Sequence, residues 1–234
     1  MPPVGEPRPL KVLAISTTTH EAKLSTSVAL TEAAILRMQA RNPAIVLRTI
    51  NANDLHIVKN LSCYANGRRD CANPESGPYR CWAHYESLQN PKKYGGVDQM
   101  PVIYDGLAWA DVVLWATSTR WGSHSALMQK VIERMDTLEN RGASWGEPYP
   151  MAGKRCGVIV AGLHWKSLAV ATHLQEVFRW FRFDVPPTDG ALVWQRTNDP
   201  YFEHPSSDKP FCERWLASKE GQQSLDLFVD AMLG

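Results

Sequence analysis

Short, uninterrupted apolar runs alternate along the chain with longer segments whose apolar residues recur every three or four positions. Runs of the first kind predict strands that are buried on both faces, and segments of the second kind predict amphipathic helices. The expected strands are residues 10–16, 44–50, 112–116, 153–162 and 183–193, the last interrupted by Pro186 and Pro187. The expected helices are residues 25–41, 101–110, 123 to about 141, 168–181 and 219–232. This alternation predicts an α/β fold: a doubly wound, parallel, five-stranded sheet with helices on both faces.

The domain organisation is simple apart from two long loops. Residues 1–9 are rich in proline and are expected to form a loose arm, and residues 10–234 are expected to form one domain. Residues 51–100 are rich in Asn, Cys, Gly, Pro and Tyr and show little periodicity, so they predict a long irregular insertion. Residues 138–151 predict a second long loop. Loops of this length are often functional.

The most informative stretch is residues 111–134, in which an apolar run leads into a hydroxyl-rich loop and then into a helix. Open α/β sheets bind ligands at the carboxyl ends of their strands, where such loops lie. A tryptophan and a glycine in this loop suit a flat, polar ring system; alternatively, the tryptophan packs in the core beside a turn. The candidate residues are Thr117, Ser118, Thr119, Arg120, Trp121 and Gly122.

The loop after the first strand is the candidate phosphate site. Hydroxyl groups precede a predicted helix N-terminus, whose N–H groups and dipole favour an anion. The alternative is that Ser25 only caps the helix and that the threonines are turn residues. Neither a Walker A sequence nor a GxGxxG motif follows this strand, so neither an NTPase nor a dinucleotide-binding site is supported. The candidate ligands here are Ser16, Thr18, Ser25 and Thr26.

A third loop, residues 162–166, follows the fourth predicted strand. His164 and Trp165 could flank a ring there, together with Gly162 and Leu163; His164 could equally be a surface histidine without a role.

The five cysteines are an odd number, which fits reduced thiols better than a disulfide framework. Cys63, Cys71 and Cys81 have the spacing C-x7-C-x9-C, with His84 close behind. Compact zinc and iron–sulfur sites use much tighter pairs, so free or loosely paired thiols and no metal are expected, with a metal or cluster as the less favoured alternative. Cys156 lies within a predicted strand and is expected to be plain core.

Composition narrows the partners and the compartment. The formal net charge is +1 and the basic residues are scattered, which argues against a nucleic-acid-binding surface. No signal-peptide pattern and no membrane-length apolar run is visible, so a cytoplasmic location without membrane contact is expected. Residues 142–146 match GxSxG around Ser144, but a nucleophile elbow needs a strand before the serine and a helix after it, which this context lacks.

These segments together resemble the flavodoxin-like NAD(P)H-dependent FMN reductase family. The resemblance covers about residues 10–50 and 101–185, and its most specific part is the second loop, where the family motif resembles FxTPVYWGSMSAxLKxFIDR. Trp121, Gly122, Ser123, Ser125 and Ala126 match this motif, whereas Thr117 and Ser118 replace its Thr-Pro. In the first loop, residues 17–20 replace the family's Gly-Ser-Pro-Arg. The resemblance therefore implies Thr18 and Ser25 as the best-matched phosphate ligands, with His20 beside them.

The resemblance implies an enzyme that binds FMN noncovalently and uses NAD(P)H as co-substrate. Electrons would pass through the flavin to a small-molecule acceptor such as a quinone or free flavin. It also implies a homodimer or homotetramer whose interfaces complete the flavin pocket. His164 is the one residue proposed as catalytic, because a histidine at the ring edge could donate a proton near neutral pH. Two alternatives remain at this point: a non-enzymatic flavodoxin-type electron carrier, and a serine hydrolase acting through Ser144.

Overall fold

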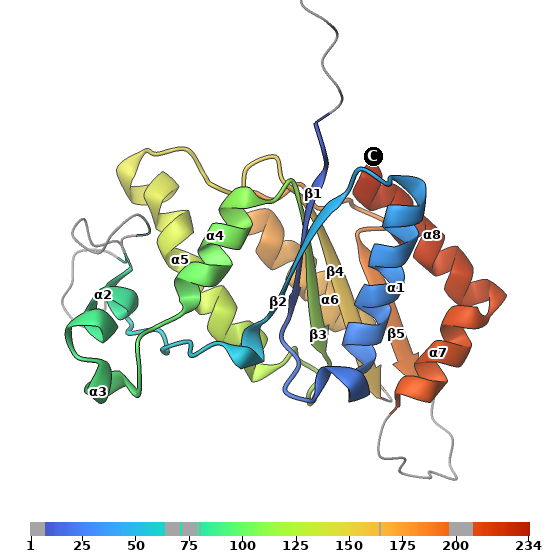
Figure 1. The fold of residues 1–234 in the computed structure, drawn as a ribbon, viewed down its shortest axis with the longest axis horizontal. Coiled ribbons are helices and arrows are strands. Elements are labelled where there is room, and N and C mark those ends of the chain that lie inside the picture. The colour runs from blue at the N-terminus through green and yellow to red at the C-terminus, as the bar shows by residue number, and fades with distance from the viewer. Residues whose placement is uncertain (1–7, 64–70, 72–78, 80, 164, 197–207) are drawn as a thin grey trace, which may run out of the picture.

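Five parallel strands form a single sheet in the computed structural model, which describes residues 8–63, 71, 79, 81–163, 165–196 and 208–234 (Figure 1). The strand order is β2-β1-β3-β4-β5. This is the flavodoxin-like doubly wound order, and it confirms the predicted fold class. Its switch point, where ligands bind in such sheets, lies between β1 and β3. The strands are β1 (Lys11–Ser16), β2 (Val46–Asn51), β3 (Val112–Ser118), β4 (Arg155–Leu163) and β5 (Ala191–Arg196).

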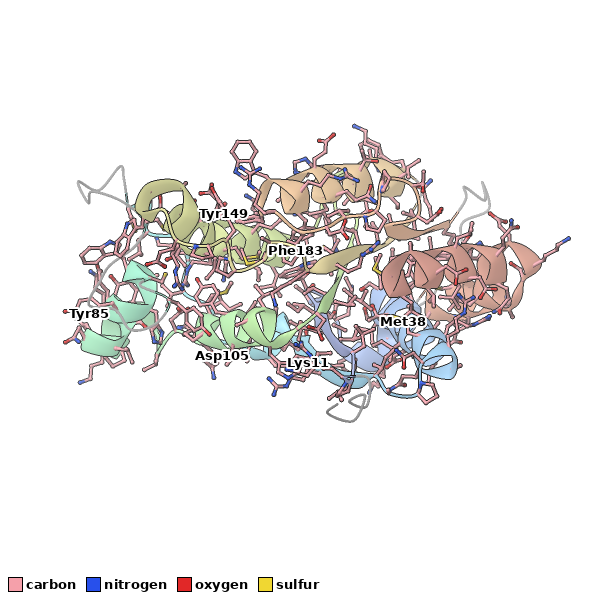
Figure 2. The ribbon with its side chains drawn as sticks, turned by 90° about the horizontal axis from the view of Figure 1, so that it is seen from above. Lys11, Met38, Tyr85, Asp105, Tyr149 and Phe183 are labelled. Atoms are coloured by element: carbon pink, nitrogen blue, oxygen red, sulfur yellow. The ribbon has the colours of Figure 1, made fainter. Side chains whose placement is uncertain are left out.

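Helices cover both faces of the sheet. The helices α1 (Thr26–Arg41), α7 (Lys209–Ala217) and α8 (Lys219–Leu233) pack against one another on one face. The other face carries α4 (Met100–Trp109), α5 (Ala126–Trp145) and α6 (Ser167–Trp180). Figure 2 looks along the strands and shows these two layers with the sheet between them.

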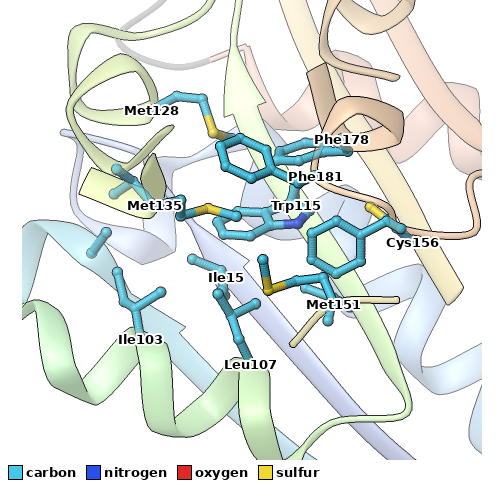
Figure 3. Packing of buried hydrophobic residues seen from close by; sticks show 14 of the residues in the cluster. Ile15, Ile103, Leu107, Trp115, Met128, Met135, Met151, Cys156, Phe178 and Phe181 are labelled. Carbon is cyan, nitrogen blue, oxygen red and sulfur yellow. The ribbon is translucent and has the colours of Figure 1, made fainter. Parts of the chain in front are cut away.

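The strand residues alternate between the two cores, as the period of a strand requires. In β3, Val113 and Trp115 face the α4–α6 layer, whereas Val112 and Leu114 face the layer that contains α1. Trp115 is fully buried and stacks on Phe178 of α6, with ring centroids 4.9 Å apart. Figure 3 shows it enclosed by side chains that include Met128, Met135, Met151 and Phe181. Because both faces are buried, the central strands are apolar throughout, which made them visible in the sequence.

Two elements have bounds that differ markedly from the sequence-based expectation, and one helix was not expected. The helix α5 continues past residue 141 to Trp145 and ends at Gly146, whose φ of 67° makes it a left-handed cap. Much of the predicted loop at 138–151 is therefore helical. The last strand is Ala191–Arg196 rather than 183–193, because the two prolines lie in the approach to the strand, where only an isolated bridge joins Asp184 to Arg155. The helix α7 was not predicted.

The expectation that residues 51–100 are irregular is wrong in part. This segment contains the 3-10 turn η2 (Ala52–Asp54) and the helices α2 (Trp82–Gln89) and α3 (Pro91–Tyr94). Both helices are short and neither has a broad apolar stripe, so their periodicity is too weak to be seen in the sequence. The segment is joined to α5 by an ion pair between the side chains of Asp98 and Arg134, both essentially buried.

Three further features concern the N-terminal arm, the edge strand β2 and the length of the helices. Of the predicted loose arm at 1–9, residues 1–7 lie outside the described residues, and Arg8 forms an ion pair with Asp111. The strand β2 is a sheet edge, and Arg48 on it is exposed with its guanidinium 4.1 Å from the ring centroid of Trp109. Every helix in the described segments is too short or too polar to cross a bilayer.

Candidate functional site

Three loops leave the carboxyl ends of β1, β3 and β4 and line one pocket. The strand order places these ends side by side, so residues more than a hundred positions apart meet there. The wall is mixed, with hydroxyl groups at the α1 end and apolar side chains from β4 and β5. The lining residues are Thr18, His20, Leu24, Ser25, Thr26, Ser27, Ser118, Thr119, Arg120, Ala161, Gly162, Leu163, Trp194 and Asp208.

The first loop is held to the sheet by its own backbone and hydroxyl groups. Thr17 donates both its amide N–H (2.9 Å) and its Oγ1–H (3.0 Å) to the carbonyl oxygen of Ala116 on β3. The amide of His20 donates to Oγ1 of Thr18. Ser25 caps α1, accepting the N–H of Val28, and its Oγ is 3.1 Å from Oγ of Ser27. Hydroxyls of residues 25–27 therefore gather where the positive end of the α1 dipole meets the pocket.

Ser125 couples the first loop to the second. Its Oγ donates to the carbonyl oxygen of Thr17 (3.1 Å) and accepts the N–H of Met128 (3.1 Å), so one side chain caps α5 and ties it to the first loop. Thr117, fully buried, donates its hydroxyl to Oγ of Ser125. The hydroxyl groups of Ser125 and Thr117 thus fix the first and second loops relative to each other.

The tip of the second loop is a two-residue hairpin. Arg120 and Ser123 exchange two backbone hydrogen bonds, of 2.7 and 3.0 Å. The residues between them, Trp121 (φ 49°) and Gly122 (φ 77°), both lie in the left-handed region, as a type I′ turn requires. This conformation costs a non-glycine residue about 1–2 kcal/mol. Trp121 is also 96% exposed, so no packing of the ring within the described residues offsets the strain.

The third loop begins where β4 meets the start of α6. A Cβ atom on Gly162 would lie 2.2 Å from Oγ of Ser167 and 2.7 Å from Oγ1 of Thr119, so only glycine fits there. These two hydroxyls are 3.1 Å apart and hydrogen-bonded. The half-exposed ring of Trp165 packs beside Gly122. His164 lies outside the described residues, so its proposed catalytic role stays a prediction.

The pocket brings together most of the residues that the sequence singled out. Thr18, His20, Ser25, Thr26, Ser118, Thr119, Arg120, Gly162 and Leu163 line it. Among the described side chains, five of the predicted residues are not part of its wall: Ser16, Thr117, Trp121, Gly122 and Trp165. Ser16 accepts the amide of Thr18, and so supports the first loop from behind.

Five lining residues were missed: Leu24, Ser27, Ala161, Trp194 and Asp208. Ser27 could have been found, since it lies in the first turn of a helix directly after the hydroxyl residues Ser25 and Thr26. Asp208 could not, because it reaches the pocket from the other end of the chain. There its carboxylate pairs with Arg196 at 2.9 Å, which ties the start of α7 to the end of β5.

A histidine pair lies behind the second loop. The ring of His124, which is largely buried, stacks on that of His173 of α6, with centroids 5.8 Å apart. Burial, reinforced by the nearby His173, lowers the pKa of His124, although a hydrogen bond with the carbonyl of Ser125 opposes the shift. The neutral imidazole is thus the favoured form at this position.

Comparison with known proteins decides the class of the chain. A family model described as NADPH-dependent FMN reductase matches residues 10–196, which include the strand-end loops at 16–27, 117–122 and 162–166. The chain belongs to this family. It is therefore an NAD(P)H-dependent flavin oxidoreductase that uses FMN. None of the curated proteins compared matches the chain significantly in sequence.

Solved structures share the fold at low sequence identity. RosB, with bound 8-demethyl-8-formylriboflavin-5'-phosphate, is 15% identical, with a TM-score of 0.64 over 96% of this chain and 79% of RosB. The apo form of the NADH:FMN oxidoreductase EMOB is 16% identical, with a TM-score of 0.57 over 96% and 89% of the two chains. An azoreductase from Bacillus anthracis is 11% identical, with a TM-score of 0.52 over 96% and 100%.

The hydrolase alternative has no structural support. Ser144 lies in the last turn of α5, and its hydroxyl donates to Oδ1 of Asn140 within that helix. A nucleophile elbow places its serine on a sharp turn between a strand and a helix, which is absent at this position.

Proposed function

We propose that this FMN reductase binds the flavin in the pocket at the strand ends and passes its electrons to a small planar acceptor. The observation that carries the proposal is the convergence of the three loops on one pocket, with a hydroxyl-rich helix N-terminus at one end. When bound, FMN supplies the chemistry by accepting hydride from NAD(P)H. The protein binds, orients and shields it.

The first loop suits the phosphate group of FMN. Hydroxyls of Thr18, Ser25, Thr26 and Ser27 line this end, and the N–H groups at the start of α1 lie with them. These groups donate to an anion without a buried cation. His20, on the same wall, is exposed to solvent. The remaining candidate ligands of the second and third loops would then surround the ribityl chain and the ring.

The second loop offers a restricted set of amides to the edge of the flavin ring. The N–H groups of Thr119 and Arg120 are already bonded, to the carbonyls of Ala161 and Ser123. No bond to the amides of Trp121 and Gly122 is present among the described residues. We assign the ring contacts of this loop to these two N–H groups at its tip. A role of these two amides in binding would be the reason that the strained left-handed backbone is kept.

The acceptor is proposed to be a quinone, free flavin or a similar flat molecule. The rings of Trp121 and Trp165 are exposed beside the pocket, and flat aromatic molecules stack on such rings. His164 stays a candidate proton donor, to be tested by His164→Gln.

A second copy of the chain is the proposed partner. Helix α6 and the loops beside it expose several large apolar side chains, Trp121, Trp165, Leu168 and Trp180, which a subunit interface would cover. The outcome expected in light scattering is a dimer or tetramer. A cytoplasmic location is proposed because none of the five cysteines forms a disulfide.

The test is an anaerobic titration of the FMN-loaded protein with NADPH, followed by absorption. We expect the flavin bands to bleach and then to recover when a quinone is added. Bands that bleach only with a separate reductase would identify an electron carrier. Failure to retain FMN at all would remove the proposal.

A further inference from the structure

Three cysteines that are far apart in the sequence meet in one buried cluster. Cys63, Cys71 and Cys81 are each about 5–7% exposed, and all three line a single small cavity against α5. Cys81 is the residue from which α2 begins, whereas Cys63 and Cys71 precede that helix. The wide spacing that argued against a compact metal motif therefore does not keep the sulfurs apart. Among the described residues, no group of three ligands has the arrangement of a metal site.

The surroundings of these thiols are polar, unlike those of an ordinary core cysteine. Cys71 is hydrogen-bonded to Cys63 and to the carboxylate of Asp136 on α5; the contact with Cys63, burial and the negative charge of Asp136 together raise the pKa of the Cys71 thiol well above its ordinary value, so it is held as the neutral thiol. Arg134, two residues earlier on that helix, donates from Nη2 to Sγ of Cys81 at 3.2 Å. Together, these contacts give the cluster a proton acceptor beside one thiol and a cationic donor beside another.

The two remaining cysteines of the chain differ from the cluster in their neighbours, although the pKa of each is raised as that of Cys71 is. Cys156 lies fully buried within β4, and burial is the main reason that the pKa of its thiol is raised. Burial likewise raises the pKa of Cys212 to about 12. Neither has a second thiol beside it in the described structure. They are packed as small hydrophobes, whereas Cys63 and Cys71 are a hydrogen-bonded pair.

The guanidinium group of Arg134 is held rigidly, so the cluster has a defined geometry. Its Nη1 and Nη2 donate to Oδ1 (2.9 Å) and Oδ2 (2.6 Å) of Asp98, and Nη1 also donates to the carbonyl of Val58 (2.7 Å). A bidentate pair of this kind fixes orientation as well as charge. The cavity itself measures about 10 Å³, which is about the space of one water molecule.

We propose that Cys63 and Cys71 are a dithiol that hydrogen peroxide oxidises to a reversible disulfide. The sulfur of Cys63 attacks one peroxide oxygen, the O–O bond breaks, and a sulfenic acid and one water are formed. The sulfur of Cys71 then displaces the sulfenic hydroxyl as its proton passes to Asp136 and on to the leaving oxygen, which departs as a second water. Two thiols and one peroxide thus give one disulfide and two waters, with two electrons moving from sulfur to oxygen.

The sequence makes the product easy to identify. Trypsin cleaves after Lys59, Arg68, Arg69, Arg80 and Lys92, so the three cysteines fall in separate peptides, residues 60–68, 70–80 and 81–92. The FMN-loaded protein is reduced, desalted, treated with hydrogen peroxide, alkylated in denaturant, digested and analysed by mass spectrometry. We expect peptides 60–68 and 70–80 to be joined, two hydrogens lighter than their sum, and to separate again on reduction with dithiothreitol.

Two variants sharpen the result. Cys81→Ser should leave the link between the other two peptides intact, since Cys81 takes no part in the covalent step. Asp136→Asn keeps the shape of the side chain but removes the proton acceptor, and should slow formation of the link about tenfold or more, with melting temperature as the check on folding.

Three outcomes would overturn the proposal. These are a link that includes peptide 81–92, full alkylation of all five cysteines after peroxide treatment, and thiols that react only after a metal chelator is added. None of these readouts depends on flavin reduction, so the proposal stands or falls separately from the oxidoreductase function.

Discussion

The strand-end pocket and the segment 52–100 are held in place by different kinds of interaction. In the pocket, backbone groups and neighbouring hydroxyls carry the structure, as in the bonds from Thr17 to Ala116 and within the hairpin 120–123. In the segment, a few side chains do this work, above all the contacts of Arg134 with Asp98 and Val58. The first arrangement joins adjacent strand ends through many backbone and hydroxyl hydrogen bonds, so it does not depend on any one of them. The position of segment 52–100 depends on single charged groups, so the loss of one of them is expected to destabilise the segment.

The largest effect is expected from breaking the buried ion pair. Asp98→Ala leaves the guanidinium of Arg134 buried without its counter-charge, which should cost about 3–5 kcal/mol of unfolding free energy. Urea denaturation followed by circular dichroism measures it. The double variant Asp98→Ala/Arg134→Met removes both charges and should recover part of the loss. A loss below about 1 kcal/mol for Asp98→Ala would mean that the segment does not rely on this pair.

A smaller loss of stability, with a direct effect on the pocket, is expected from Gly162→Ala. The added methyl group would collide with the hydroxyls of Ser167 and Thr119, so the loops must separate at a cost of about 1–3 kcal/mol, and FMN affinity should fall. Gly146→Ala is the matched control. Nothing lies within 4 Å of its Cβ position and only its positive φ is strained, so it should destabilise the chain without changing FMN affinity.

Removing one capping hydroxyl should separate binding from folding. Ser25→Ala and Ser218→Ala each delete the N-cap of a long helix, α1 or α8, and each should cost about 1 kcal/mol of stability. Only Ser25→Ala should weaken FMN binding, by about tenfold, because only this hydroxyl lines the pocket. Fluorescence titration with FMN and with riboflavin, which has no phosphate, provides the check. An equal loss for both flavins would show that Ser25 does not contact the phosphate.

The smallest effect on stability, and one of opposite sign, is expected at Trp121. Trp121→Gly relieves the left-handed backbone and should raise the unfolding free energy by about 1 kcal/mol while loosening FMN retention. Trp180→Ala, at another exposed tryptophan, should leave FMN retention unchanged. A variant at position 121 that loses melting temperature and flavin in parallel would mean that the ring serves folding.

This contrast also explains how far the sequence could be interpreted. Strands and loop positions were predicted because a strand buried on both faces is apolar without interruption, and because Ser25 and Ser125 cap helices directly after hydroxyl-rich loops. The turn at 121–122 was not recognised, since type I′ turns usually carry Asn-Gly rather than Trp-Gly. Asp208 and the thiol cluster depend on contacts between distant parts of the chain, for which a single sequence carries no local signal.

The edge strand β2 has a consequence for behaviour at high concentration. An exposed strand with unpaired backbone groups is a template on which other chains can add and precipitate. Arg48 stands on that edge with its charge fixed over the ring of Trp109, so a second strand cannot approach without burying a cation. This one side chain thereby helps to keep a nearly neutral protein dispersed, and Arg48→Val should lower the concentration at which turbidity first appears.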